Sequence, residues 1–469
     1  MPSFDDAVPP IALGALDGRY RTSVAPLVDH LSEAALNRTR VHVEVEWLIH
    51  LTDAAVVPGV RVLTTQEKQE LRAYVTSFGT DEVAELAEIE RETVHDVKAV
   101  EYFLKRRLAV VAPAAADRGL SELIHFACTS EDINNLSYAL MVQGAVRSVW
   151  LPRATDVVDQ VAAMARDLRD VPLLAHTHGQ PATPTTMGKE LAVLAHRLRR
   201  QLGRITRADY LGKFNGATGT YGAHLAALPD VDWPAVSKSF VESLGLTWNP
   251  LTTQIESHDW QAELYADVAR FNRVMHNLCT DVWTYISLGY FAQVRGQGSV
   301  GSSTMPHKVN PIRFENAEAN LEVSNALLDV LGSTLVQSRL QRDLTDSSMQ
   351  RNIGSAFGHS LLALDNVSRG LAGLDAVPAR MAGDLDSNWE VLGEAVQSAM
   401  RALAAQGVSG MDKPYERLKE LTRGRRTTQA DLVEFIAGLG LPDDVAARLS
   451  AMTPQTYVGA ASRLVDFLD

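Results

Sequence analysis

Cysteine is almost absent from this sequence of 469 residues, which contains only Cys128 and Cys279. The two cysteines lie far apart, and neither stands in the short spacing typical of a zinc site. Histidine, aspartate and glutamate form no group with metal-ligand spacing either. These absences favour a reducing, cytoplasmic setting, and we expect the protein to use no metal and no other cofactor.

Long apolar runs are missing as well. No stretch approaches the roughly 20 residues that a helix needs to cross a bilayer. At the start of the chain, Asp5 and Asp6 stand where a secretion signal would carry lysine or arginine. We therefore expect neither secretion nor insertion into a membrane.

Positive charge is in deficit, because 44 lysines and arginines against 57 aspartates and glutamates give a net charge of −13. Nonspecific binding of nucleic acid needs a basic surface, so nucleic acid is not an expected partner. The basic segment from Lys413 to Arg426 is interleaved with Glu416 and Glu420, which favours a solvated helix face. A single pocket on an acidic protein can still be positive and bind an anionic small molecule.

Strand-like alternation is scarce, whereas helical periodicity is strong. Three stretches place apolar residues at steps of three, four or seven, the spacing of one face of a long helix. These residues are Leu264, Val268, Phe271, Met275, Leu278, Val282 and Tyr285; Leu191, Leu194, Leu198, Leu202 and Ile205; and Leu321, Leu328, Leu331 and Leu335. Such stripes suit a bundle with partner helices from the same chain or another copy. The sequence predicts a mostly α fold with a central bundle of long helices.

Proline and glycine mark two candidate domain boundaries, near residues 111–120 and 371–381. The length of the chain also suggests about two to four domains. We expect an N-terminal helical domain at 1–119, a central long-helix domain with the catalytic loops at 120–372, and a C-terminal helical domain at 373–469.

Two non-helical islands interrupt the central block, at His176–Pro184 and Arg295–Pro311. Loops on a rigid helical scaffold are where chemistry usually occurs. In the second island, Gly296, Gly298 and Gly301 follow the order G-x-G-x-x-G, but this dinucleotide fingerprint needs a strand before it and a helix directly after it. Here a long helix precedes the glycines and a proline-containing loop follows. We interpret them as loop glycines, and without a Walker-type motif any phosphate must be bound by other groups.

The string that follows these glycines, GSSTMPHKVNP at residues 301–311, resembles the signature of the fumarase/aspartase superfamily, whose members eliminate fumarate from a substituted succinate. Other strings resemble the adenylosuccinate lyase family within it, in its longer bacterial form. They are ETVHDVKAVEYF, IHFACTSEDINN, HTHGQPATP, FENAEANLEVSNALL, SRLQRDLTDSSMQRNIG and DKPYERLKELTRGRR. The resemblance covers essentially the whole chain.

The resemblance implies a three-domain helical fold and a reaction. In that family, β-elimination of fumarate converts adenylosuccinate to AMP and SAICAR to AICAR in purine biosynthesis. The expected ligand is therefore a succinylated purine-pathway nucleotide, and no cofactor is needed. Members of the family are homotetramers in which helices of four copies form one core and three subunits contribute to each active site.

The reaction must remove a weakly acidic proton from carbon and deliver one to the departing nitrogen. By resemblance, Ser302 is the catalytic base, although a hydroxyl needs activation, for which the glycine-rich loop and Lys308 are candidates. His178 matches the general acid, and an imidazole pKa of about 6.5 suits that task. Taken alone, each residue would more often be an ordinary turn or structural residue, so the resemblance carries both assignments.

The resemblance also implies a set of substrate-binding residues for the carboxylates, the phosphate and the purine or imidazole. Arginine forks suit phosphate, while Lys308 and Asn310 match anchors of a carboxylate. The whole set is Arg19, Tyr20, His95, Asp96, His125, Thr129, Ser130, Gln254, Ser303, Lys308, Asn310, Asn316, Arg342, Ser347 and Arg351.

Two residues depart from the family pattern. Val94 precedes His95 where longer relatives usually have asparagine, which removes one polar contact. His176 stands where a permanently charged arginine is expected. That change predicts weaker phosphate or scaffold contacts, or activity that depends more on pH.

Three alternatives remain. The first is a sister lyase, argininosuccinate lyase or fumarase, which shares Ser302 and Lys308; His307 argues for the adenylosuccinate family, because fumarases tend to have glycine there and argininosuccinate lyases glutamine. The second is a non-catalytic descendant, as some lens crystallins are, against which the intact His178, Ser302 and Lys308 argue. The third is a coiled-coil scaffold, which leaves both islands unexplained.

Overall fold

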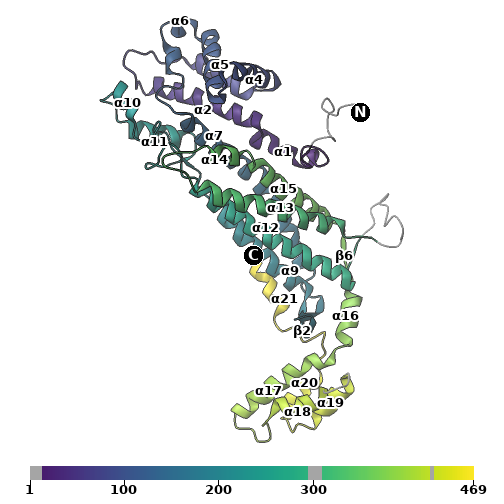
Figure 1. The fold of residues 1–469 in the computed structure, drawn as a ribbon. Coiled ribbons are helices and arrows are strands. Elements are labelled where there is room, and N and C mark those ends of the chain that lie inside the picture. Colours follow the sequence, from purple (N-terminus) through teal and green to yellow (C-terminus); the bar gives the residue numbers. More distant parts are fainter. Residues whose placement is uncertain (1–12, 294–308, 423–426, 469) are drawn as a thin grey trace. The chain divides into compact units, whose positions relative to one another are not determined.

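The structure is a computed structural model that describes residues 13–293, 309–422 and 427–468. Helices make up most of these residues, and three two-stranded sheets contain the strands found among them (Figure 1). The predicted mostly α fold is therefore confirmed.

Contacts divide the chain into two compact units that do not follow chain order. Unit 1 comprises Met1–Ala154, Gln201–Arg273 and Ala319–Asp365, and unit 2 comprises Thr155–Arg200, Val274–Glu318 and Asn366–Asp469. The three consecutive domains expected from the sequence stay a prediction.

Five long helices contribute residues to both units: α8 (Leu151–Asp167), α9 (Met187–Thr206), α12 (Asp259–Leu288), α13 (Ile312–Leu335) and α15 (Ile353–Leu371). The three predicted apolar stripes fall on α9, α12 and α13, and every stripe residue except the half-buried Tyr285 is buried. Because burial follows the three-to-four spacing, apolar area removed from water is the main force that holds these helices in place.

The remaining elements of unit 1 are further helices and one small parallel sheet. They are α1 (Arg21–Leu31), α2 (Glu33–Asp53), α3 (Thr65–Thr76), α4 (Thr80–Thr93), α5 (Asp96–Val111), α6 (Pro113–Ala116), η1 (Leu120–Leu123), α7 (Ser130–Ala145), η2 (Val146–Trp150), β3 (Leu211–Gly212), α10 (Gly222–Ala227), α11 (Trp233–Ser243), β4 (Thr247–Trp248) and α14 (Thr345–Gln350). Several begin at a residue that caps the helix, as where Ser32 Oγ accepts the Ala35 N–H at 3.1 Å before α2.

Helix α2 has buried residues around most of its circumference, unlike an ordinary surface helix. Trp47 is fully buried on it, as expected for an interior helix, but so are the charged side chains of Arg40 and Glu44. A buried charge needs a partner, so these two residues demand ion pairs from other segments of unit 1.

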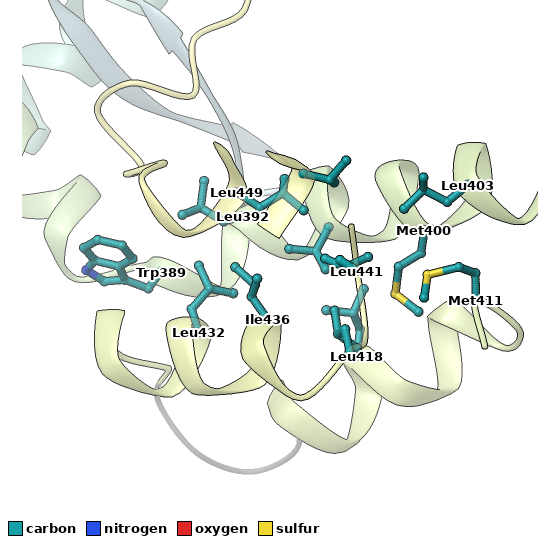
Figure 2. Packing of buried hydrophobic residues seen from close by; sticks show 13 residues of the cluster. Trp389, Leu392, Met400, Leu403, Met411, Leu418, Leu432, Ile436, Leu441 and Leu449 are labelled. Atoms are coloured by element: carbon teal, nitrogen blue, oxygen red, sulfur yellow. The ribbon is translucent and has the colours of Figure 1, made fainter. Parts of the chain in front are cut away.

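Unit 2 contains two antiparallel strand pairs, of which only β1–β2 is a hairpin, and the C-terminal helices. Its elements are β1 (Pro172–Thr177), β2 (Gln180–Thr186), β5 (Phe291–Gln293), β6 (Leu374–Ala376), α16 (Pro378–Asp386), η3 (Trp389–Leu392), α17 (Gly393–Ala405), α18 (Pro414–Thr422), α19 (Gln429–Ala437), α20 (Asp443–Ser450), α21 (Ala461–Leu464) and η4 (Val465–Leu468). The helices from η3 to α20 surround an apolar cluster that includes Met400, Ile436 and Leu449 (Figure 2). This cluster has no charged member and is a small core of its own.

Candidate active site

Asp96 lies in the first turn of α5, next to the cap of that helix. His95 is the cap, because its Nδ1 accepts the Lys98 N–H at 3.2 Å. Arg40 Nη2 donates to Asp96 Oδ2 at 2.8 Å, and Arg351 Nη2 lies 3.6 Å from the same oxygen. Burial raises the pKa of Asp96, but the charge of Arg40 opposes it and, with the hydrogen bonds, leaves the pKa below its ordinary value. Asp96 is therefore a carboxylate held between two arginines.

A chain of buried polar contacts continues from Arg40. Its Nε donates to Asn134 Oδ1 at 2.9 Å, and Asn134 Nδ2 donates to Glu131 Oε1 at 2.9 Å. Glu131 in turn forms an ion pair with Arg342 at 2.9 Å. Burial raises the pKa of Glu131, and the charge of Arg342 opposes that rise without cancelling it. These contacts connect Asp96 on α5 with Arg342 just before α14.

Arg342 also fixes the residues around it. Its Nη1 donates to Gln254 Oε1 at 3.2 Å, while Gln254 Nε2 donates to the Ala217 carbonyl at 2.8 Å. Asp346 lies 4.0 Å from Arg342 on one side and 3.6 Å from His258 Nε2 on the other. Gln254 thus has both ends of its amide engaged, which fixes its orientation.

Arg351 lies at the other end of this series of contacts. Its Nη1 donates to Ser347 Oγ at 2.9 Å, and its Nε lies 3.4 Å from Glu33. The side chain of Arg351 keeps 40% of its surface exposed and that of Arg342 keeps 20%, so both guanidiniums remain accessible to an anion. Five predicted substrate-binding residues share this connected set, which we call the charge network: Asp96, Gln254, Arg342, Ser347 and Arg351.

Thr129 and Ser130 form the N-terminus of α7. Asp132 accepts the Thr129 N–H at 2.8 Å and pairs with Lys213 at 2.8 Å, with both side chains fully buried. The Asn215 N–H also donates to Asp132, at 2.9 Å. This end of α7 is therefore anchored to the segment after β3, and the helix dipole makes it a suitable place for a carboxylate of a ligand.

His125 lies in the turn between η1 and α7, with a left-handed backbone at φ 58°. Its Nδ1 lies 2.5 Å from Glu44 Oε1, and its backbone N–H donates to Glu44 Oε2 at 3.0 Å. Both oxygens of one buried carboxylate therefore hold this single residue.

Val94 ends α4 in the left-handed region at φ 51° and is 88% exposed. A β-branched residue is strained there, whereas asparagine tolerates the conformation. The asparagine usual in relatives thus has a backbone reason as well as a polar one, and this chain bears strain directly beside His95.

His178 stands at the tip of the β1–β2 hairpin. Thr177 pairs with Gln180, so His178 and Gly179 alone form the turn, with φ of 53° and 72°. Two left-handed central residues match the type I′ turn that suits a twisted hairpin. The island predicted as a loop is therefore a pair of strands with a tight turn, and His178 is exposed on it. His176, also exposed, lies on β1 opposite Pro181.

The base of this hairpin is fixed by packing. Leu174 on β1 forms a small buried cluster with Leu385 and Val391. After β2 the chain enters α9, where Gly188 comes so close to the preceding helix that a Cβ there would lie 2.5 Å from the Arg169 backbone. The hairpin thus has a rigid base and an exposed tip.

The other predicted residues are scattered or lie outside the described residues. Arg19 is exposed, with its guanidinium 5.8 Å from the Tyr20 ring centre. Asn310 is exposed just before α13, and Asn316 is half-buried on that helix. The catalytic candidate Ser302 and the binding candidates Ser303 and Lys308 lie outside the described residues.

Sequence reasoning missed the residues that hold the site together, above all Arg40, Glu44, Glu131 and Asn134. A signal was available for Arg40 and Glu44, because these charged residues four apart share a helix face with the apolar Leu36, Trp47 and Leu51. For Glu131 and Asn134 the signal was a helix start that is polar on every side.

Two kinds of feature were not found in the part of the chain that the structure describes. Within residues 13–293, 309–422 and 427–468, no group of three or more His, Cys, Asp or Glu side chains is arranged to hold a metal ion. Among the same residues, no helix is long and apolar enough to cross a membrane.

Comparisons with known proteins agree along the whole chain. A family model described as Lyase matches residues 18–324, and one described as Adenylosuccinate lyase C-terminal matches residues 338–458. The adenylosuccinate lyase of Escherichia coli K12 is 49% identical over 97% of this chain and 98% of its own length. That of Haemophilus influenzae Rd is 47% identical with the same coverage.

Solved structures share the fold at much lower identity. A fumarate lyase from Mesorhizobium sp. BNC1 has a TM-score of 0.74 at 19% identity and covers 95% of this chain and 97% of its own. A 3-carboxy-cis,cis-muconate lactonizing enzyme from Pseudomonas putida has a TM-score of 0.71 at 20% identity, with coverage of 94% and 96%. The mostly α fumarase/aspartase fold expected from the sequence is thereby confirmed.

Proposed function

Because the chain belongs to the adenylosuccinate lyase family of the fumarase/aspartase superfamily, we propose that it splits adenylosuccinate with His178 as general acid and Ser302 as general base. The chain is a lyase, and its family favours neither of the sister activities, argininosuccinate lyase or fumarase. The same site cleaves SAICAR to AICAR, since both substrates carry a succinyl group on nitrogen. The finer proposal concerns which residues perform each step.

The reaction balances with one base and one acid. Ser302 removes a proton from the carbon next to a carboxylate, and the C–H electrons form the double bond of fumarate. The C–N bond breaks with its electrons on nitrogen, which takes a proton from His178 and leaves as the amine of AMP. Lys308 and Asn310 bind a carboxylate, and the accessible guanidiniums of Arg342 and Arg351 suit the phosphate.

The observation that supports these binding roles best is the charge network. Two partly exposed arginines are held in place by carboxylates that are themselves buried or half-buried. The distinguishing feature is that Glu131 is itself buried and is joined through Asn134 to the buried Arg40, so the network continues into the interior of unit 1. Preorganised cations are what a substrate with two carboxylates and a phosphate requires.

A side-by-side assay of adenylosuccinate, argininosuccinate and malate tests the function. We expect release of fumarate with AMP from the first and no comparable turnover of the other two. Equal or greater turnover of argininosuccinate or malate would contradict the proposal. SAICAR in the same assay should also yield fumarate.

We further propose that the active form is a homotetramer with sites shared between subunits, acting in the cytoplasm. Exposed apolar side chains on α9, α12 and α13 support assembly with other copies; they are Val193, Trp283, Val323 and Val330. The free Cys128 and Cys279 support a reducing setting. Mixing inactive His178→Ala and Ser302→Ala variants should restore activity, because some mixed sites regain both residues. If subunit exchange is verified and activity stays absent, the two residues do not meet across subunits.

A further inference from the structure

Glu44 is a fully buried carboxylate whose two oxygens both bind His125. Oε1 lies 2.5 Å from the imidazole Nδ1, and Oε2 accepts the backbone N–H at 3.0 Å. The imidazole, by contrast, keeps 19% of its side-chain surface exposed. With Nδ1 turned inward to the carboxylate, the Nε2 side of the ring is the part left to meet a ligand.

The other charges around His125 already have partners. Glu101 on α5 binds Lys98 at 2.8 Å and Lys105 at 3.1 Å. Asp132 on α7 binds Lys213 at 2.8 Å. For Glu44, no lysine or arginine partner occurs in the described part of the chain. Since a buried carboxylate needs a cation or several donors, His125 is the group that meets this need.

The charges around His125 act in the same direction as this geometry. Burial lowers the pKa of His125, but the hydrogen bond and charge of Glu44 outweigh burial, and Glu101 and Asp132 add to the effect. The pKa of His125 is therefore raised above its ordinary value, so the ring stays protonated to higher pH.

We propose that Glu44 is a positioning residue that holds His125 as an imidazolium with its Nε2–H directed at an anionic oxygen of the substrate. This inference rests on the proposed function and on the substrate-binding role that the family resemblance implies for His125. The left-handed backbone at φ 58° supports it, because the Glu44 contact to the N–H holds His125 in a conformation that histidine seldom adopts. The anionic oxygen belongs to either the succinyl group or the phosphate.

The two reaction products separate these sources. Fumarate carries only the carboxylates and AMP only the phosphate, so the inhibition constant of each is measured from pH 6 to 9 in wild type and Glu44→Gln. In wild type, affinity for one product should fall as the pH rises through the pKa of His125. In Glu44→Gln that fall should move to lower pH by about one unit or more, because the opposing charge is gone. The product whose affinity shifts identifies the group.

Matched variants isolate the contact. Glu46→Gln, on the same helix but paired with the exposed Arg72 at 2.6 Å, should leave the profile unchanged. Glu44→Asp keeps the charge, so the decrease in product affinity should occur near the same pH as in wild type. This variant replaces Glu44→Gln in the test if Glu44→Gln folds poorly. In a His125→Gln background, the pH-dependent fall should vanish and Glu44→Gln should add nothing.

Three results would overturn the proposal. They are a Glu44→Gln profile that coincides with wild type, equal shifts in the Glu44→Gln and Glu44→Asp variants, or a pH-dependent fall that persists in His125→Gln. A protein that merely loses thermal stability in Glu44→Gln, with its profile intact, would show a structural role alone. Wild-type turnover of adenylosuccinate tests the proposed function separately, so the two failures are distinguishable.

Discussion

The charge network of unit 1 and the hairpin of unit 2 hold functional candidates by opposite means. Arg342 and Arg351 are held by the carboxylates of Glu131 and Asp96, and further side-chain contacts connect both carboxylates to the buried Arg40. His178 is fixed through its backbone, in a two-residue turn, and no hydrogen bond or ion pair to its ring is found among the described residues.

The difference matches the two tasks proposed for them. A group that binds a fixed anion gains from a rigid guanidinium, because no reorganisation is then needed on binding. A group that gives up a proton and regains it in each turnover must exchange with its surroundings. Substitutions in the charge network should therefore lower the stability of the protein, whereas replacing the general acid should leave the fold intact.

The largest expected effect comes from His178→Ala. Turnover should fall about 10²- to 10⁴-fold, the scale of general acid catalysis, while the melting temperature stays within a degree or two of wild type because the side chain is exposed at a hairpin tip. His196→Ala, at an exposed position on α9, is the control and should keep its turnover. Near-normal turnover of the His178→Ala variant would show that the general acid is not His178.

The second test breaks the network at its buried member. Arg40→Met leaves Asp96 without its closest cation, so the free energy of unfolding should fall by about 3–5 kcal/mol. Arg72→Met removes a pair with Glu46 in which the arginine side chain is about half exposed, and it should cost about 0–1 kcal/mol. Denaturant unfolding measures both. Equal losses of unfolding free energy in the two variants would mean that burial does not make the Arg40 contacts more important for stability than the Arg72–Glu46 pair.

The third test uses pH on the same carboxylate. The folded-state pKa of Asp96 lies below its ordinary value, so its charge stabilises the fold above that ordinary value, and the contribution is lost as pH falls through the folded pKa. Asp96→Asn should be less stable than wild type by about 1–3 kcal/mol at neutral pH. The gap should close as pH drops below about 4. A gap independent of pH would assign the loss to shape rather than charge.

The smallest effect concerns strain beside His95. Val94→Asn suits the left-handed backbone better and should stabilise the protein by about 1 kcal/mol. Val110→Asn, at an exposed helical position on α5, should be neutral or slightly destabilising. Thermal unfolding of both variants checks this, and a destabilised Val94→Asn would show that the strain is offset by contacts of the valine.

Elements that depend on local spacing could be predicted from the sequence. The stripe of α12 was predicted because each turn of a helix repeats the same burial, so Leu264 and Leu278 report on the same face. The β1–β2 hairpin was predicted only as a non-helical island. Its His178–Gly179 turn lacks the usual Asn-Gly signal, and its proline-rich second strand shows no alternation.

The network could be predicted only in part, and for a physical reason. Resemblance pointed to Arg342, Arg351 and their contacts Asp96, Gln254 and Ser347. The deeper members Arg40, Glu131 and Asn134 were missed, because the partners of Arg40 lie far away in sequence. Asp96 is 56 residues from Arg40, and Asn134 is 94 residues from it. The residues next to Arg40 in the sequence do not indicate which carboxylate it pairs with, because a pairing over this separation leaves no local pattern.

The same separation has a consequence for synthesis on the ribosome. Arg40 and Glu44 leave the ribosome on a helix that must bury them, but Asn134 follows much later, and Glu131 waits for Arg342, a further 342 − 131 = 211 residues. At about 5–20 residues per second, that wait lasts roughly 10–40 s. During it, Arg40 and Glu44 already have their partners Asp96, Asn134 and His125 in the nascent chain, whereas Glu131 is still without its arginine. The charge network therefore becomes complete only after Arg342 and Arg351 have also left the ribosome.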